Sequence, residues 1–444
     1  MLVGEQPTCP TTAQGKKVRR ALAGLVEFPP AAQNQGSRDY SMTALFQKIA
    51  LVSVAIALLG CPVAARELTP TEQSTLLSAR PGDVLQLGEF LSARPDLPLV
   101  PLQIKAAPGP RLLLSDKPEY LLVGDGITLR EEVAPGKVRL YLYHVPTPGP
   151  DAKTISAVIE NLARKPMRLR FTHRARPQPG TDYHFIGKTG LLDYFNSRPE
   201  KGTSTIAPHA LALLDPQLDA AVAMRDQLVH GFYEFEISQP ARITVLQRAV
   251  SDRSLTVVDT LPLLPQTLPG KATGNGAGRG IFPVSNFTVV NAPGTRLDTA
   301  QGPQQLIVAD GKSDGWIEGR DSIDGRASRN VGNYGVIYRI RLTRASSDGR
   351  ALALLMGKIN SSSRWCGAQA GAVQVSRGDW PAGTVAIPRD RVFFGKPYEA
   401  VLVQTFPPLR KGKTETIEIN YSPPGASCIP TPMVFVPLVV PSRG

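Results

Sequence analysis

The stretch Val138-Arg-Leu-Tyr-Leu-Tyr-His144 decides the expected fold, because aliphatic side chains occupy every second position in it. In an extended strand, residues two apart point to the same face of a sheet. Similar short alternating runs occur at 154–159, 167–171, 231–237 and 242–246, separated by turn-forming residues. Period-two alternation with frequent turn residues predicts an all-β fold built from antiparallel β-sandwiches.

A second set of strand-like runs follows a Pro- and Gly-rich stretch at 263–277, the clearest linker in the chain. We therefore predict two tandem β-sandwich-like domains, at 98–262 and 278–444. Helices are expected to be few and short. Thr69-Pro-Thr-Glu72 has the form of a capping box with proline at the first helical position, so residues 66–97 should begin with a short helix at 70–78. Asp215-Pro216 predicts the start of another helix.

The composition is that of a globular protein with many turns. The 444 residues include 40 Gly and 41 Pro, and charged residues make up 20% of the chain. The 50 Lys and Arg outnumber the 37 Asp and Glu, which gives a formal charge of +13. This balance favours anionic surroundings such as nucleic acid, phospholipid headgroups or wall polymers, without choosing among them.

Residues 42–65 resemble an export signal. A short basic start with Lys48 precedes about a dozen apolar residues, too few to span a bilayer comfortably, and Val63-Ala-Ala65 suits cleavage before Arg66. We therefore expect an extracellular, cell-surface or periplasmic protein, with residues 1–41 as a non-native upstream segment and no transmembrane span after cleavage. Lipidation at Cys61 is the alternative, although Pro62 and Leu59 suit a lipoprotein signal poorly.

Cleavage after residue 65 would leave two cysteines, Cys366 and Cys428. An even number of cysteines in an exported chain predicts a disulfide. Closing this loop would stabilise the fold by roughly 4 kcal/mol if chain entropy dominates. A pair of buried free thiols is the alternative.

The pair Asn333-Tyr334 raises the question of a quinone cofactor, because copper amine oxidases form theirs from the tyrosine of an Asn-Tyr pair. Those enzymes have Ser or Thr three residues before the Asn and an acidic residue after the Tyr, whereas this chain has Asn330 and Gly335 there. Copper also needs imidazoles, and all five histidines precede Tyr334. We therefore expect Tyr334 to be an aromatic residue at the entry to a strand.

Gly311-Lys-Ser-Asp-Gly315 matches the Gly-x-Ser-x-Gly motif of hydrolases. That motif requires a following helix and a later histidine, and no histidine follows this serine. We therefore predict no catalytic residues, and we expect no cofactor with the exception of the calcium alternative below.

Acidic residues recur between 310 and 324, and three of them are weak candidates for a metal site: Asp310, Asp314 and Asp321. Lys312 stands where a calcium loop requires an oxygen ligand. Acidic turn residues are the simpler interpretation, since Asp is favoured in turns. A calcium-dependent lectin or a carbohydrate-active enzyme using this cluster is the alternative function.

A row of arginines marks the most polarised strand. In an extended strand from 167, Arg168, Arg170, Thr172 and Arg174 would share one face, opposite Met167, Leu169 and Phe171. Guanidinium groups pair well with carboxylate and phosphate, so Arg168, Arg170 and Arg174 are the predicted binding residues for an anionic wall polymer or glycan. No nucleic-acid partner is expected, because aromatic residues do not interleave with these arginines. A solvated outer face is the alternative.

Six stretches resemble, in order, a group of exported bacterial proteins of unknown function. They are Ser115-Asp-Lys-Pro-Glu-Tyr120, Val138-Arg-Leu-Tyr-Leu-Tyr-His144, Gly187-Lys-Thr-Gly-Leu-Leu-Asp-Tyr194, Leu228-Val-His-Gly-Phe-Tyr-Glu-Phe235, Gly332-Asn-Tyr-Gly-Val-Ile-Tyr338 and Tyr421-Ser-Pro-Pro-Gly-Ala-Ser427. Members of that group often carry wall-associated modules labelled "copper amine oxidase-like N-terminal domain", and no such module is recognisable here. The resemblance implies a cell-envelope protein and supplies no catalytic residues. We expect a non-enzymatic structural or adhesive role.

Overall fold

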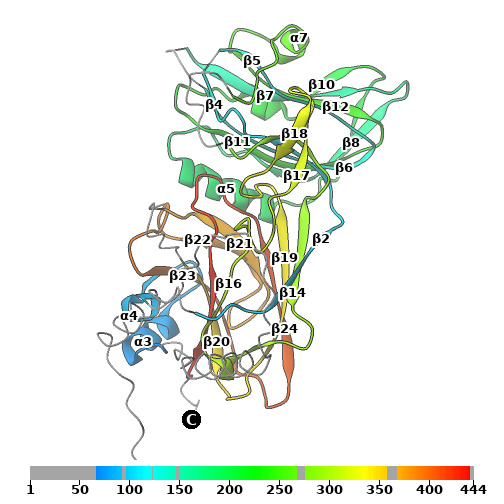
Figure 1. The fold of residues 1–444 in the computed structure, drawn as a ribbon. Coiled ribbons are helices and arrows are strands. Elements are labelled where there is room, and N and C mark those ends of the chain that lie inside the picture. Colours follow the sequence, from blue (N-terminus) through cyan, green and yellow to red (C-terminus); the bar gives the residue numbers. More distant parts are fainter. Residues whose placement is uncertain are drawn as a thin grey trace, which may run out of the picture. The chain divides into compact units, whose positions relative to one another are not determined.

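The computed structural model describes residues 67–92, 97–122, 124–146, 151–267, 276–357 and 368–440 (Figure 1). Four β-sheets and a few short helices account for its regular structure, so the all-β prediction is confirmed. Most neighbouring strands are antiparallel, but β3–β6 and β14–β19 are parallel pairs, which makes two of the sheets mixed.

The first two sheets enclose one hydrophobic core. The nine-stranded sheet runs in the order β18 (Arg326–Arg329), β17 (Glu318–Asp321), β13 (Arg279–Phe282), β3 (Arg111–Ser115), β6 (Gly136–Pro146), β11 (Val229–Ile237), β8 (Met167–Ala175) and β9 (Ser204–Ile206), with β4 (Tyr120–Leu121) beside β6. The four-stranded sheet runs β10 (Leu211–Leu213), β7 (Lys153–Asn161), β12 (Ala241–Ala249) and β5 (Gly126–Val133). As the alternation predicts, Val138, Leu140 and Leu142 of β6 point together into this core.

The other two sheets enclose a second core. The seven-stranded sheet runs β2 (Leu102–Ala107), β14 (Asn286–Asn291), β19 (Ile337–Ala345), β24 (Thr414–Tyr421), β21 (Gly371–Val375) and β22 (Gly383–Ile387), with β15 (Leu297–Asp298) beside β19. The five-stranded sheet runs β1 (Val84–Gln86), β23 (Glu399–Phe406), β20 (Ala351–Gly357), β25 (Met433–Leu438) and β16 (Gln304–Leu306). Strand β20 is apolar throughout because both of its faces are buried.

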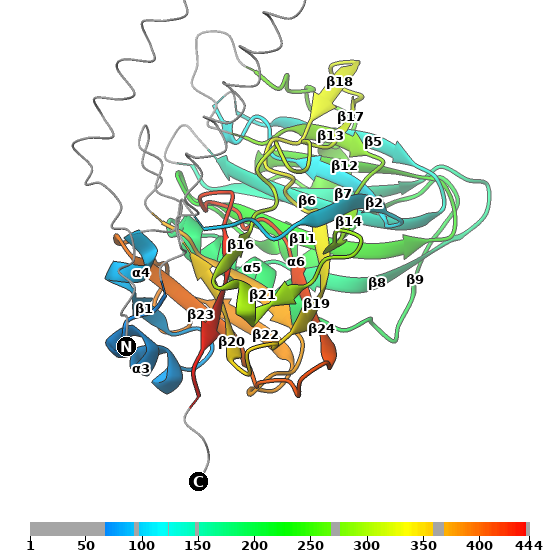
Figure 2. The same cartoon turned by 60° about the horizontal axis from the view of Figure 1, so that its bottom comes forward.

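Short helices cover exposed sheet faces or fill the space between sheets. They are α3 (Pro70–Ser78), α4 (Gly88–Ser92), α5 (Tyr183–Asn196), α6 (Pro216–Ala220), α7 (Ser254–Val257) and the 3₁₀ turn η2 (Thr299–Gln301). The predicted capping box is present at α3, where Thr69 and Glu72 exchange hydrogen bonds. Helices α3 and α4 lie beside β1 and β23, on the outer face of the five-stranded sheet (Figure 2). Asp215 caps α6 as expected.

Helix α5 lies between the nine-stranded and the seven-stranded sheet (Figure 1). Its buried Ile186, Leu191 and Tyr194 belong to the same core as Tyr141 and Tyr143, which point away from the four-stranded sheet. Strand β6 therefore has both faces buried, one in each core. This arrangement brings aromatic side chains of β6 close to the loops of the seven-stranded sheet.

Strands cross the predicted boundary between the two halves of the sequence. Strand β2 precedes that boundary but pairs with β14, and β13, β17 and β18 follow it but extend the sheet that contains β3. Residues 268–275 of the predicted linker lie outside the described residues. Each half thus contributes strands to sheets that it shares with the other half, and the division into domains at 98–262 and 278–444 stays a prediction.

The expected signal at 42–65, the upstream segment and Cys61 also lie outside the described residues. In the part of the chain that is described, no helix is both long and apolar enough to cross a membrane.

Candidate functional site

Three tyrosines and two carboxyl groups surround a pocket of about 250 Å³ where the nine-stranded sheet approaches the loops of the seven-stranded sheet. Its lining residues are Asp116, Glu119, Tyr141, Tyr143, Tyr334, Gly425, Ala426 and Ser427. We call this the tyrosine–carboxylate pocket. Its residues come from four separate parts of the chain.

Strand β6 supplies the first aromatic wall. Tyr141 and Tyr143 lie two residues apart and therefore on the same face. Behind them stands the buried His230, whose ring centroid is 4.8 Å from that of Tyr141 and 5.9 Å from that of Tyr143. The Nδ1 of His230 lies 2.8 Å from the carbonyl oxygen of Leu142, and burial lowers the pKa of His230 to about 4. A neutral, hydrogen-bonded imidazole thus supports both rings.

The turn after β3 carries the two carboxyl groups. Ser115 Oγ lies 2.7 Å from His144 Nε2, and His144 Nδ1 lies 2.9 Å from the carbonyl oxygen of Pro118. Burial lowers the pKa of His144 to about 4, so its neutral ring donates to the carbonyl through Nδ1 and accepts from the serine through Nε2. This serine–histidine pair is fully buried. It therefore fixes the turn that carries Asp116 and Glu119, and does not face the pocket.

Asp116 is the more buried of the two acids of the pocket. One carboxyl oxygen, Oδ2, accepts a hydrogen bond of 2.8 Å from the amide of Ala277, while Oδ1 has no hydrogen-bond partner among the described residues. The side chain is 6% exposed. Burial raises the pKa of Asp116 well above its ordinary value, and the nearby Glu119 raises it further. Burial therefore favours the neutral carboxylic acid over the carboxylate at this position.

Tyr334 forms the other end of the aromatic lining. It lies in the turn that precedes β19. Asn330 holds this turn with two hydrogen bonds, donating to the carbonyl of Tyr334 at 2.8 Å and accepting from its amide at 3.0 Å. Asn333 adopts a left-handed backbone with φ 51°, a conformation that asparagine tolerates better than most residues. As predicted, Tyr334 precedes a strand, but it also lines a pocket, which the sequence did not indicate.

The loop after β24 closes the pocket. Gly425 packs so tightly that an added Cβ would lie 2.7 Å from the Tyr143 ring and 2.9 Å from the Tyr141 hydroxyl. On its other side, the carbonyl oxygen of Gly425 would lie 2.4 Å from a Cβ on Gly187 of α5. Ala426 has a positive φ of 59°, which is uncommon for a residue with a side chain and is often found at binding sites. Glycines on both sides therefore allow the helix, the loop and the tyrosines to meet.

All six sequence stretches that carry the family resemblance meet at or directly behind this pocket. Four of them line it, and the other two supply α5 and His230. Each stretch contains a tyrosine, and that was the available signal for the site. Strand alternation alone could not show that these turns converge, because it carries no information about which strands are neighbours.

The predicted arginine row is only partly formed. Arg168 and Arg170 are exposed on one face of β8, as expected. A β-bulge at Thr172 then shifts the register, so the predicted alternation is wrong from that residue onward. Arg174 consequently lies on the opposite face, with its guanidinium 4.0 Å from the centroid of the Phe171 ring and ion-paired to Glu200 at 2.9 Å.

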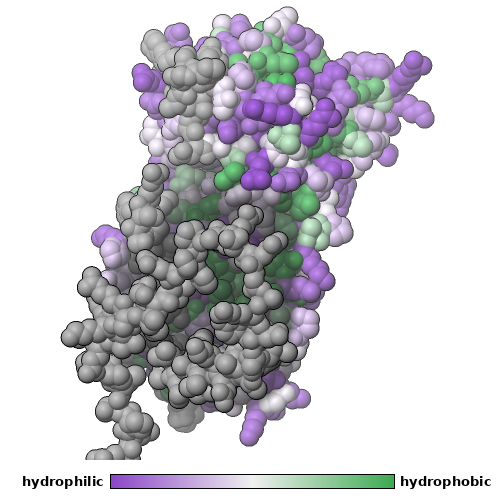
Figure 3. Space-filling view, viewed as in Figure 1, coloured by the Kyte–Doolittle hydropathy of each residue, from purple (hydrophilic) through white to green (hydrophobic). Residues whose placement is uncertain are grey.

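Arg168 and Arg170 line a shallow basin of about 590 Å³ together with Lys137. We call this the basic basin. Glu236 lies among these cations, 2.6 Å from Arg170 and 3.7 Å from Lys137, and Arg168 makes no ion pair with any residue that the structure describes. Hydrophilic residues gather around the ends of β6 and β8 on the face shown in Figure 3. Three cations around one carboxylate leave a net positive surface.

Each acidic residue proposed for calcium is already engaged in hydrogen bonds or an ion pair. Asp310 caps a turn through the amides of Lys312 and Ser313. Asp314 is hydrogen-bonded to Tyr338 and to the amide of Ala309, and Asp321 forms a fully buried pair with Arg279 at 2.7 Å. Among the described residues, no group of three or more His, Cys, Asp or Glu side chains could hold a metal ion. Asp310 thus has the turn role of the simpler interpretation, Asp321 has an ion-pair role, and calcium binding stays an untested alternative.

The predicted disulfide cannot be placed, because Cys366 lies outside the described residues. Cys428 is buried, in the loop just beyond the tyrosine–carboxylate pocket. The pairing stays a prediction.

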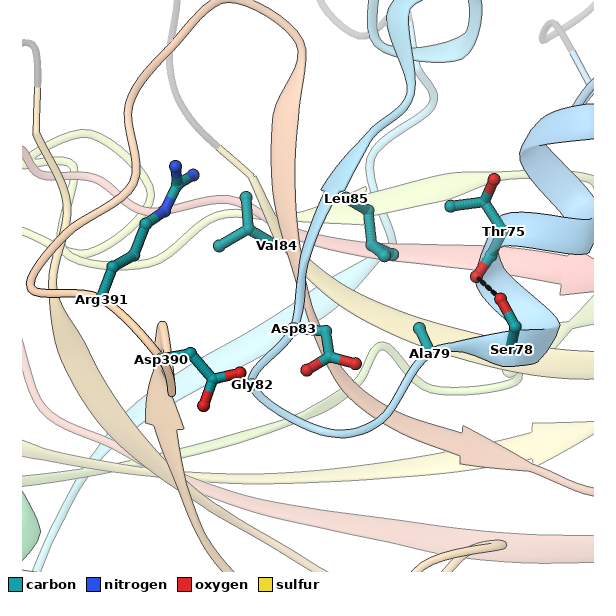
Figure 4. Close-up of a pocket in the computed structure, with 9 residues that line it drawn as sticks. All are labelled: Thr75, Ser78, Ala79, Gly82, Asp83, Val84, Leu85, Asp390 and Arg391. Carbon is teal, nitrogen blue, oxygen red and sulfur yellow. Dashed lines mark hydrogen bonds between the residues drawn. The ribbon is translucent and has the colours of Figure 1, made fainter.

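A third hollow lies between α3, β1 and the loop at 390–391 (Figure 4). It is open, and its charged groups already have partners: Asp83 binds Arg389 at 2.8 Å and Arg391 binds Glu399 at 2.5 Å. The hydroxyl of Ser78 is likewise used, donating to the carbonyl of Thr75. We therefore regard it as a surface depression.

No protein-family model matches the chain, and no curated protein matches it. Among solved structures, the N-terminal CBM22-1-CBM22-2 tandem domain from Paenibacillus barcinonensis Xyn10C is 12% identical, covering 83% of this chain and 94% of that chain with a TM-score of 0.14. A salicylate 1,2-dioxygenase from Pseudaminobacter salicylatoxidans is 11% identical, covering 90% and 95% with a TM-score of 0.12. Similarities this weak carry no argument about fold or function.

Proposed function

We propose that this chain is an exported, non-catalytic protein of the cell envelope that adheres to anionic wall polymers or glycans through the basic basin. The observation that carries the proposal is the basin itself, in which Lys137, Arg168 and Arg170 surround a single carboxylate. Guanidinium groups form paired hydrogen bonds with carboxylate and phosphate. Residues 66–444, the expected mature chain, hold 44 Lys and Arg against 34 Asp and Glu, and this formal charge of +10 would add a long-range attraction to the same partners.

Arg168, which has no ion-pair partner among the described residues, gives the basin its capacity for a new anion. Arg170 and Lys137 share Glu236, so an incoming carboxylate competes with Glu236 for them, whereas Arg168 needs no such exchange. The pairs in the basin are exposed, with side-chain exposures of 34–60%, and exposed pairs are worth only about 0–1 kcal/mol each. Replacing them with a polymer contact therefore costs little, and the resulting affinity should depend strongly on salt.

Retention on a polyanion tests this function. The double variant Arg168→Glu/Arg170→Glu should bind a carboxylated polysaccharide, such as polygalacturonate, at least tenfold more weakly in low salt. The matched control is Arg326→Glu/Arg329→Glu on β18, which makes the same charge change on two exposed arginines outside the basin. Equal loss in both variants would show that net charge alone is responsible, and undiminished binding by the basin variant would refute the proposal.

Cell fractionation tests the location. The expectation is exported material whose first residue is Arg66, or detergent-soluble membrane material if Cys61 is lipidated. Recovery of a cytosolic protein that retains residues 42–65 would contradict export.

A further inference from the structure

Two polar atoms in the wall of the tyrosine–carboxylate pocket have no hydrogen-bond partner among the described residues: Asp116 Oδ1 and Tyr141 Oη. Their side chains are 6% and 2% exposed. Buried polar groups are nearly always hydrogen-bonded, and leaving one without a partner costs about 1–3 kcal/mol. Both residues line the same small pocket, so one molecule bound there could satisfy both atoms.

We propose that the tyrosine–carboxylate pocket binds an uncharged, hydroxyl-rich group of about the size of one sugar unit. This site is independent of the basic basin, because the two share no lining residue.

The hydrogen-bonding groups of the pocket suit hydroxyl groups. Asp116 accepts from Ala277 through Oδ2, which leaves Oδ1 to pair with a ligand hydroxyl, as an acceptor when ionised and as a donor when protonated. Burial raises the pKa values of Tyr141 and Tyr143, which therefore stay neutral and offer both a donor and an acceptor. A ligand hydroxyl can donate and accept, and so can pair with either kind of group.

The charge of the lining argues against an anionic ligand. No lysine, arginine or histidine lines the pocket, and Glu119 does. A ligand carboxylate or phosphate would lose its hydration without gaining a cation, which is strongly unfavourable. We therefore expect anions to bind at the basic basin and not in this pocket.

The arrangement of the rings argues against an organic cation. Cation recognition requires the charge to lie over an aromatic face, commonly within a cage of rings. Here the ring centroids of Tyr141 and Tyr334 are 6.1 Å apart with a 37° tilt, a distance at which two aromatic rings pack on each other. They thus form one continuous wall against which the apolar face of a sugar ring can lie.

The volume limits the ligand to a single unit. At about 30 Å³ per water molecule, 250 Å³ holds roughly eight waters, just below the range of about 300–1,000 Å³ for pockets that bind drug-sized ligands. The pocket therefore suits a monosaccharide or the terminal unit of a longer glycan.

Calorimetric titration of the full chain with uncharged saccharides tests the proposal. Glucose, galactose, mannose and N-acetylglucosamine would each be titrated up to tens of millimolar, with choline and acetate as charged probes. At least one saccharide should bind saturably and independently of salt. Tyr141→Phe should weaken that binding about fivefold to tenfold, which corresponds to the loss of one hydrogen bond. Asp116→Asn should bind about as tightly as the parent chain, because the amide oxygen still accepts from Ala277 and the amide nitrogen offers a donor in place of Oδ1.

These variants are chosen to remain folded. Tyr141→Phe removes a hydroxyl that has no partner among the described residues, and Asp116→Asn keeps an acceptor for the amide of Ala277. Tyr421→Phe, which removes a buried tyrosine hydroxyl from outside the pocket, is the matched control and should bind normally. Binding of choline or acetate in preference to every saccharide, no saccharide binding at all, or binding unaffected by Tyr141→Phe would overturn the proposal.

Discussion

Arg139 is the residue that links the two halves of the fold most directly. From β6 it donates to Glu234 of β11 at 2.7 and 3.0 Å, and its Nη1 reaches the carbonyl of Gly335 at 3.1 Å beside the turn that carries Tyr334. The same nitrogen also donates to the carbonyl of Ser285 at 2.7 Å. Its side chain is only 2% exposed. One guanidinium thus holds together strands and loops that are distant in the sequence.

Replacing Arg139 should therefore be costly. Arg139→Met leaves the carboxylate of Glu234 buried with only Tyr194 to bind it, and breaking a buried ion pair costs about 3–5 kcal/mol. The matched control is Arg341→Met, which breaks the exposed pair with Glu418 and should cost no more than about 1 kcal/mol. Urea unfolding of the two variants measures the difference, and similar losses in both would contradict this account.

Two buried histidines should make the fold sensitive to acid. Burial lowers the pKa values of His144 and His230 to about 4, whereas an unfolded histidine titrates near 6.5. As pH falls from about 6.5 to 4, the unfolded chain binds protons that the folded chain excludes, so stability falls. Each histidine should contribute a loss of about 2 kcal/mol between pH 7 and pH 5.

The histidine contribution can be isolated in a variant. His230→Asn keeps a side-chain donor near the carbonyl of Leu142 but cannot titrate. Unfolding free energies at pH 7 and pH 5 should show that its loss on acidification is about 2 kcal/mol smaller than that of the parent chain. An unchanged loss would mean that His230 does not stay neutral in the folded protein.

At the scale of elements, α5 depends on two glycines in its interior. Glycine normally weakens a helix by about 1 kcal/mol relative to alanine, so a Gly→Ala change in a helix is usually stabilising. Here an added Cβ would lie 2.4 Å from the carbonyl oxygen of Gly425 at Gly187, and 2.5 Å from the His230 ring at Gly190. Close packing therefore requires glycine at both positions.

Gly187→Ala should consequently destabilise the fold by about 1–3 kcal/mol, as overpacking does, and should also disturb the loop that closes the tyrosine–carboxylate pocket. Gly88→Ala in α4 is the matched control, because the nearest atom to its added Cβ is 4.0 Å away. Thermal unfolding should show a lower midpoint for Gly187→Ala and no loss for Gly88→Ala. A stable Gly187→Ala variant would refute the close contact.

Patterns of neighbouring residues predicted individual strands and helices better than they predicted how those strands and helices pack. The capping box at Thr69 and the alternation from Val138 to Leu142 led to correct predictions, because both depend on neighbouring residues alone. The bulge at Thr172 moved Arg174 to the opposite face, and nothing in the local pattern marks that extra residue. Helix α5 was not predicted, since the interior glycines that its packing requires are poor helix formers.

At the scale of the whole molecule, alternation identifies strands but not their partners. The apolar stripe of β2 fits any half-buried sheet, and the structure pairs it with β14, more than 170 residues later. The tyrosine–carboxylate pocket depends on the same long-range pairing, because Asp116, Tyr141, Tyr334 and Gly425 belong to segments that meet only in the folded chain. The sequence could therefore name the stretches that build the pocket without locating it.

This exchange of strands predicts that the chain from 67 to 440 unfolds as one cooperative unit. Melting either half alone would expose the edge of β3 that pairs with β13, the edge of β14 that pairs with β2, and the apolar side chains around α5. Scanning calorimetry should show a single transition whose van't Hoff and calorimetric enthalpies agree.

Arg139→Met should lower the midpoint of that transition without splitting it, because Arg139 binds groups on both sides of the predicted boundary at 263–277. Two separate transitions, one for each predicted domain, would instead mean that the crossing strands add little to the stability of either half.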